Sequence, residues 1–121
     1  MKKRILVVDD EEAIADLVRT LLVSAGYEVS VAANGNAALE QVSGFKPELL
    51  ITDITMPDME GIELISRLRK INVELPIIAM SGNPIGVGFL KATRLFGAVA
   101  TLKKPFSNKD LMAAVAQVFP A

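Results

Sequence analysis

The sequence contains no cysteine, no histidine and no tryptophan in its 121 residues. Disulfides, thiol chemistry, zinc sites built from cysteine or histidine, and histidine general bases are therefore excluded. Any chemistry must use carboxylates, hydroxyls, lysines, backbone groups and a bound ion. The lack of cysteine also fits a reducing compartment, so we expect a cytoplasmic protein.

Neither positive nor negative charge dominates, because 13 Lys and Arg residues nearly balance 14 Asp and Glu residues, for a formal net charge of −1. That balance indicates no excess of positive charge for binding nucleic acid or an anionic membrane, so direct nucleic-acid binding is not expected. Long apolar runs are also lacking: the basic start is followed by only four apolar residues, 5–8. A secretory signal or a membrane span needs a longer run, and we expect no membrane insertion.

What the sequence does contain is a regular alternation of short apolar runs and longer helical patterns. Its length fits one domain over residues 1–121. Strands are predicted at 5–8, 27–33, 49–52, 76–80 and 98–102. Helices are predicted at 12–25, 36–43, 61–70 and 89–96, and from Ser107 to near Phe119. Ser107 with Asp110 three residues later predicts a capping box at the start of the last helix. Several strands are continuously apolar, as in parallel strands covered on both faces. The pattern predicts an α/β fold with an open parallel sheet between helix layers.

Polar residues stand at or just beyond the ends of four of these predicted strands: Asp9 and Asp10, Asp53, Ser81, and Lys104. The carboxyl ends of parallel strands meet at one edge, so we expect the side chains to converge. Three clustered carboxylates repel one another, and a hard cation such as Mg²⁺ removes that conflict. A carboxylate in such a site can attack phosphorus, while an ammonium and a hydroxyl stabilise the developing charge.

Each of these residues also has an ordinary structural interpretation. The acidic run 9–12 suits the first turn of a helix, and Asp53 suits a solvated turn. Ser81 taken alone is more often structural, and Lys104 beside Lys103 is more often a solvated surface lysine. The functional interpretation depends on all of them occurring together at strand ends.

The whole set resembles the receiver domains of bacterial response regulators, over Arg4 to about Phe119. The matching motifs are Asp9-Asp10, Asp53 with Pro57 four residues later, Ser81-Gly82, and Lys104-Pro105-Phe106. The resemblance implies a flavodoxin-like, doubly wound (βα)5 fold with strand order 2-1-3-4-5. It also implies a phosphoacceptor switch of a two-component system or phosphorelay, which catalyses only its own phosphorylation and dephosphorylation.

Site roles follow from the same resemblance. Asp53 would accept the phosphoryl group, and Mg²⁺ would be held by Asp10, Asp53, the carbonyl of Thr55 and, through water, Asp9. Lys104 would pair with the carboxylate and then with the phosphoryl group. Ser81 would move to bind the phosphoryl oxygens, and Pro105 would follow a cis peptide bond.

The resemblance further implies a sensor histidine kinase or phosphotransfer protein as donor, docking near the first helix and the loop after the fifth strand. An unidentified downstream protein would bind the face of the fourth helix, fifth strand and fifth helix. Thr101 stands where the family usually has an aromatic switch residue, so the usual readout is in question. Val99 and Ala100 replace a common acidic pair, which favours a monomer or a weak phosphorylation-dependent dimer.

Three other functions remain open at this point. A phosphatase with an aspartyl nucleophile would need a second Asp two residues after Asp53, where Thr55 stands. A receiver-like interaction module would work without phosphorylation. A flavin-binding protein of the same topology would need a Ser-, Thr- and Gly-rich loop after the first strand, where four acids stand.

Overall fold

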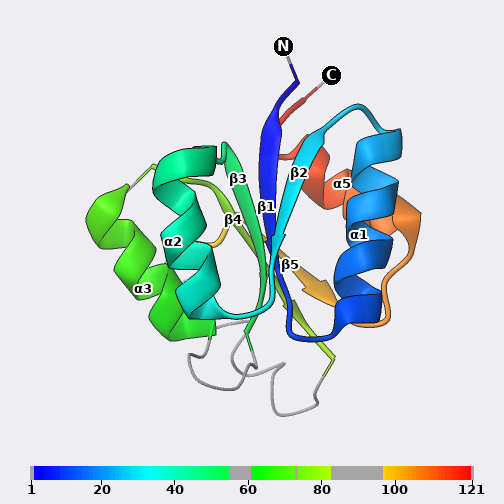
Figure 1. Cartoon of the computed structure of the whole chain (residues 1–121). Helices are drawn as coiled ribbons and strands as arrows, with labels where there is room; N and C mark the ends of the chain where they lie inside the picture. The colour runs from blue at the N-terminus through cyan, green and yellow to red at the C-terminus, as the bar shows by residue number, and fades with distance from the viewer. Residues whose placement is uncertain (1, 55–60, 73, 83–96, 121) are drawn as a thin grey trace.

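The computed structural model describes residues 2–54, 61–72, 74–82 and 97–120 (Figure 1). The described strands are β1 (Arg4–Val8), β2 (Glu28–Ala32), β3 (Leu49–Asp53), β4 (Ile77–Ser81) and β5 (Ala100–Lys103). The described helices are α1 (Glu12–Ser24), α2 (Gly35–Phe45), α3 (Gly61–Ile71) and α5 (Asn108–Ala116). The helix predicted at 89–96 lies outside the described residues.

The five strands form one parallel sheet in the order β2-β1-β3-β4-β5, which confirms the predicted fold class and strand order. Helices α1 and α5 cover one face of this sheet, and α2 and α3 cover the other (Figure 1). All strands run the same way, so their carboxyl ends share one edge, at the bottom of the view.

Successive residues of β1 pack into different layers. Ile5 and Val7 join the cluster beneath α1 and α5, whereas Leu6 and Val8 join the one beneath α2 and α3. All four are fully buried. A strand between two helix layers has no solvent face, and that is why the run is continuously apolar.

Two strands reach further toward the site than predicted. Asp53 and Ser81 are the last residues of β3 and β4, not residues that follow the strands. The ladder continues because Asp53 pairs with Met80, and the N–H of Ile54 donates to the Met80 carbonyl at 3.0 Å. Both polar side chains are consequently buried.

Other boundaries shift for local reasons. Helix α5 ends at Ala116, earlier than predicted, while Val118 and Phe119 pack beyond it as partly buried residues. In α1 the buried residues are Ala15, Val18 and Leu22. Leu17 is 52% exposed, although its helical spacing matched the other apolar residues of this segment. Ser107 and Asp110 form the predicted capping box.

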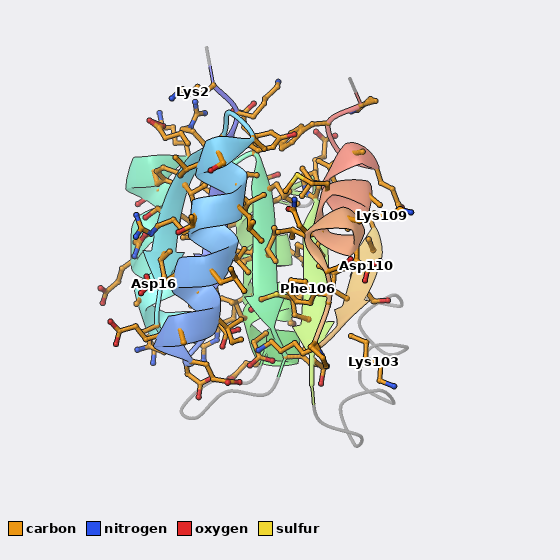
Figure 2. All side chains as sticks on the ribbon, turned by 90° about the vertical axis from the view of Figure 1, so that its right-hand side faces the viewer. Lys2, Asp16, Lys103, Phe106, Lys109 and Asp110 are labelled. Carbon is orange, nitrogen blue, oxygen red and sulfur yellow. The ribbon has the colours of Figure 1, made fainter. Side chains whose placement is uncertain are left out.

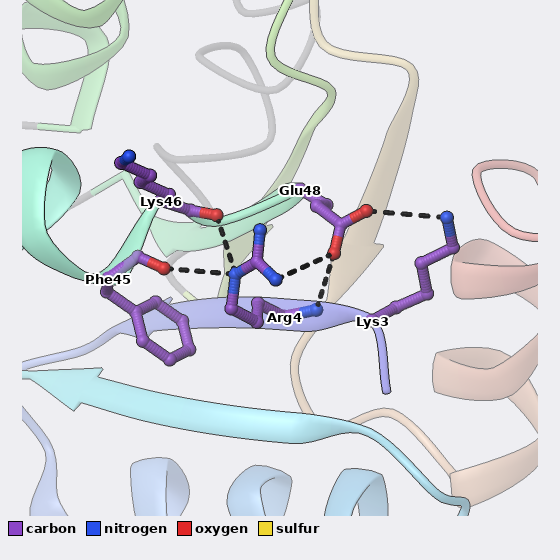
Figure 3. A network of polar contacts seen from close by, with 5 residues as sticks. All are labelled: Lys3, Arg4, Phe45, Lys46 and Glu48. Carbon is purple, nitrogen blue, oxygen red and sulfur yellow. Dashed lines mark hydrogen bonds and ion pairs between the residues drawn. The ribbon is translucent and has the colours of Figure 1, made fainter. Parts of the chain in front are cut away.

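A polar network joins β1 to β3 at the opposite edge (Figure 3). Glu48 accepts hydrogen bonds from the Arg4 backbone at 3.2 Å and from Lys3 at 3.3 Å. The Arg4 guanidinium donates to the carbonyls of Phe45 and Lys46, where the chain leaves α2 with a φ of 52° at Lys46. The Arg4 N–H lowers the pKa of Glu48, against the raising effect of burial and with further help from Lys3. This network fixes the amino-terminal edge of the sheet.

None of the described helices is both long enough and apolar enough to cross a membrane.

Candidate functional site

Three aspartates lie together at the carboxyl edge of the sheet. Each of Asp9, Asp10 and Asp53 offers an oxygen within 4.8 Å of the others'. Parallel pairing of β1 with β3 places Val8 opposite Thr52, so the next residues, Asp9 and Asp53, are neighbours. Asp9 and Asp53 are buried, and Asp10 is exposed. The edge therefore presents a cluster of hard oxygen donors, two of them held in the protein interior.

Lys104 brings a cation into this cluster. Its ammonium donates a hydrogen bond to Asp9 at 2.7 Å and lies 3.5 Å from an oxygen of Asp53. It also lies 3.5 Å from an oxygen of Glu11. Burial alone would lower the pKa of Lys104, but the hydrogen bond to Asp9 and the charges of Asp53, Asp9 and Glu11 together raise it. Lys104 is thus held protonated among the acids.

The backbone fixes where this lysine starts. The N–H of Lys104 donates to the carbonyl of Ser81 at 2.7 Å, which ties the end of β4 to the residue after β5. Gly82 leaves room for the lysine stem, since a Cβ at this glycine would lie 3.0 Å from the Cβ of Lys104. The Lys104–Pro105 peptide bond is cis, the conformation that the family resemblance implied.

These residues line one open pocket of about 590 Å³. Its lining comprises Asp10, Glu11, Ile14, Asp53, Ser81, Gly82, Lys104 and Pro105. A small anion in this pocket would meet the ammonium of Lys104 and the hydroxyl of Ser81, beside a carboxylate that can act as nucleophile. The arrangement suits transfer of a phosphoryl group onto an acid.

Most of the residues predicted from sequence come together here, with two exceptions. Thr55, expected to offer a carbonyl to the metal, lies outside the described residues. Thr101 sits half-buried in β5 and lines a separate cavity of about 290 Å³ between β5 and α5. Sequence reasoning gave Glu11 no role in the site, although its place in the acidic run 9–12 was a visible signal.

Next to the pocket lies a small apolar depression of about 80 Å³. Ile14, Leu17 and Val18 of α1 form one side of it, with Lys104, Pro105 and Phe106 on the other. Figure 2 views this side of the molecule and labels Phe106 at the approach to α5. The half-exposed Leu17 belongs to this depression, which places apolar surface beside the acidic pocket.

Comparisons with known proteins agree with this geometry. The family model for the response regulator receiver domain matches residues 5–116. The chain is 36% identical over 115 residues to the alkaline phosphatase synthesis transcriptional regulatory protein PhoP of Bacillus subtilis, covering 95% of this chain and 48% of PhoP. It is 38% identical over 111 residues to the DNA-binding transcriptional regulator NtrC of Azospirillum brasilense, covering 92% of this chain and 23% of NtrC. It therefore spans about half or less of these relatives.

Solved structures give the same result. The chemotaxis protein CheY4 of Vibrio cholerae superposes with a TM-score of 0.88 at 30% identity, covering 98% of this chain and 99% of CheY4. The receiver domain of NtrX from Brucella abortus gives 0.90 at 30% identity, covering 94% and 96%. With the family model matching most of its length, the chain belongs to the response regulator receiver domain family.

Proposed function

We propose that this protein is a phosphoacceptor switch in which Asp53 carries the phosphoryl group. The observation that supports it most is the convergence of Asp9, Asp10, Asp53 and Lys104 at the carboxyl edge of the sheet. Three of these residues, Asp10, Asp53 and Lys104, line the pocket there. Of the three acids, Asp53 is the one at the end of the central strand β3, buried beside the ammonium. Residues 1–121 would act as one receiver domain.

The acidic cluster fits Mg²⁺. Three carboxylates with oxygens within 4.8 Å of one another supply the hard ligands that this ion prefers, and Asp10 keeps one side open to solvent. We assign Asp10 and Asp53 as direct ligands, with Asp9 acting through water and the carbonyl of Thr55 completing the set. The bound ion would neutralise charge on the phosphoryl oxygens. Lys104 pairs with Asp9 and Asp53, and the third aspartate, Asp10, adds a further negative charge, so a bound cation would improve the charge balance of the cluster.

The transfer itself needs few parts. A carboxylate oxygen of Asp53 attacks phosphorus, and the bond from phosphorus to the donor breaks as the new O–P bond forms. When the donor is a phosphohistidine, the bonding pair leaves with the imidazole nitrogen. Lys104 and Ser81 then face the phosphoryl oxygens, and Lys104 exchanges its contact with Asp53 for one with the phosphoryl group.

The donor would be a sensor histidine kinase or a phosphotransfer protein, and the apolar depression suggests where it docks. Leu17 and Phe106 offer apolar surface immediately beside the pocket. An apolar helix face packed there would hold a phosphohistidine over Asp53. Output would pass to a downstream protein through the side of β5 and α5, where Thr101 lines a cavity.

The experiment is phosphorylation from acetyl phosphate with Mg²⁺, followed by intact mass measurement. Wild-type protein is expected to gain one phosphoryl group, while Asp53→Asn gains none, because an amide neither attacks phosphorus nor ligates Mg²⁺ as a carboxylate does. Asp16→Asn, on the exposed side of α1, is the matched control and should behave as wild type. No adduct on wild type, and no binding of beryllofluoride, would favour a phosphorylation-independent interaction module instead.

A further inference from the structure

Glu11 makes a contact that the fold does not need. It occupies the N-cap of α1, yet its side chain accepts no capping hydrogen bond. The capping geometry is supported from the residue's backbone instead, since the N–H of Glu11 donates to Asp9 at 3.0 Å. Its carboxylate turns toward the pocket and lies 3.5 Å from the ammonium of Lys104. The Glu11 side chain therefore contacts Lys104 at the pocket and does not cap the helix.

Glu11 differs from the other acids around Lys104 in its exposure. The Asp9 and Asp53 side chains are 0% and 6% exposed, whereas that of Glu11 is 62% exposed. A contact of this kind adds little to stability, because water screens the charge and a flexible side chain must be held. A side chain at the mouth can also swing aside, which buried Asp9 and Asp53 cannot do without repacking.

Two consequences follow for an anion that enters. Its oxygens must compete with Glu11 for the ammonium of Lys104. They also approach a negative charge at the mouth, where Glu11 and Asp10 both line the pocket. Repulsion of this kind grows with the charge of the anion and weakens as salt is added.

We propose that Glu11 is a positioning residue that acts as an electrostatic gate: it holds Lys104 and slows phosphoryl acceptance from small free anions. A donor fixed on a protein surface escapes most of this barrier, because docking on the apolar depression positions its phosphoryl group. Glu11 thereby favours a docked protein donor over free metabolites. The inference depends on the proposed function, since it concerns the rate of the same transfer onto Asp53.

The test compares Glu11→Gln with Glu12→Gln. Both changes remove one negative charge at neighbouring exposed positions, but Glu12 does not line the pocket. Initial rates are measured with acetyl phosphate, a dianion, and with phosphoramidate, a monoanion at neutral pH. Glu11→Gln should raise the acetyl phosphate rate about three- to tenfold and the phosphoramidate rate about two- to threefold. Glu12→Gln should stay within about twofold of wild type.

The salt dependence of the phosphorylation rate is a second measurement, and a purely structural role of Glu11 would not change it. The gain of Glu11→Gln over wild type should shrink as ionic strength rises, while thermal unfolding of both variants stays close to wild type. The gating role of Glu11 would be refuted if Glu11→Gln were phosphorylated no faster than Glu12→Gln. It would also be refuted if the rate increase over wild type were the same with both donors. Failure of wild type to accept any phosphoryl group would refute the proposed function itself, which is a different result.

Discussion

The Asp9 side chain is 0% exposed, and Lys104 donates a hydrogen bond to it at 2.7 Å. A buried carboxylate without a cation would be expensive to keep ionised. At the residue scale, Lys104 therefore stabilises the buried Asp9 carboxylate, in addition to the proposed role beside Asp53. The adjacent Lys103 is exposed, so two neighbouring lysines have different roles.

Lys104→Met should lower the free energy of unfolding by about 3 kcal/mol at neutral pH without divalent cations, because it leaves the Asp9 carboxylate buried without its partner. Lys103→Met is the control and should change the free energy by about 0.5 kcal/mol or less. Urea unfolding of the two variants and wild type measures both values. Equal free energies of unfolding for the two variants would show that the buried pair of Lys104 and Asp9 does not measurably stabilise the fold.

The pH dependence of that difference follows from the raised pKa of Lys104. A lysine whose pKa is higher in the folded state binds its proton more tightly there than in the unfolded chain. Its contribution is thus fully present below its unfolded pKa of about 10.5 and is lost as pH rises through the higher folded value. The difference in unfolding free energy between wild type and Lys104→Met should stay constant from neutral to mildly alkaline pH. A difference that disappeared within that range would contradict a raised pKa for Lys104.

At the scale of elements, α5 depends on its first turn. The Ser107 hydroxyl accepts from the N–H of Asp110 at 3.0 Å, and the Asp110 carboxylate accepts from the N–H of Ser107 at 3.3 Å. Ser107→Ala should cost about 1 kcal/mol of unfolding free energy in chemical denaturation. Ser43→Ala, at an exposed position inside α2, is the matched control and should be neutral or slightly stabilising. Equal effects of the two changes would argue against a stabilising cap.

The same capping box shows what can be predicted from sequence. Local signals such as Ser107 with Asp110, and apolar runs such as 5–8, depend on near neighbours and were confirmed. The gathering of Asp9, Asp53 and Lys104 was also predictable, because parallel topology brings strand ends to one edge whatever the intervening residues are.

Other features depend on packing that no local pattern encodes. The Lys104 ammonium lies closer to Asp9 than to Asp53, and the path of the Lys104 side chain past Gly82 sets that position. The exposure of Leu17 depends on how α1 is turned against the sheet, since several apolar residues of that helix fit more than one buried stripe. The periodicity of apolar residues predicts that α1 has a buried face, but it does not predict how the helix is rotated against the sheet.

At the scale of the whole molecule, the Glu48 network and the candidate site lie at opposite edges of one sheet. The amino-terminal edge joins opposite charges, with Glu48 bound to Lys3 and Arg4. The carboxyl-terminal edge gathers like charges, with three aspartates and Glu11 around one lysine. Under the proposed function, this excess of acid would allow the edge to bind a cation, and the cation would in turn neutralise the charge of a phosphoryl group.

The most direct measurement is to trap and locate the modified acid. Protein treated with acetyl phosphate and Mg²⁺ is reduced with borohydride, which converts an acyl phosphate to an alcohol, and the peptides are then sequenced. We expect homoserine at position 53 and unmodified aspartate at positions 9 and 10. Reduction at Asp9 or Asp10, or no reduced residue in protein that gained a phosphoryl group, would contradict phosphoryl transfer to Asp53.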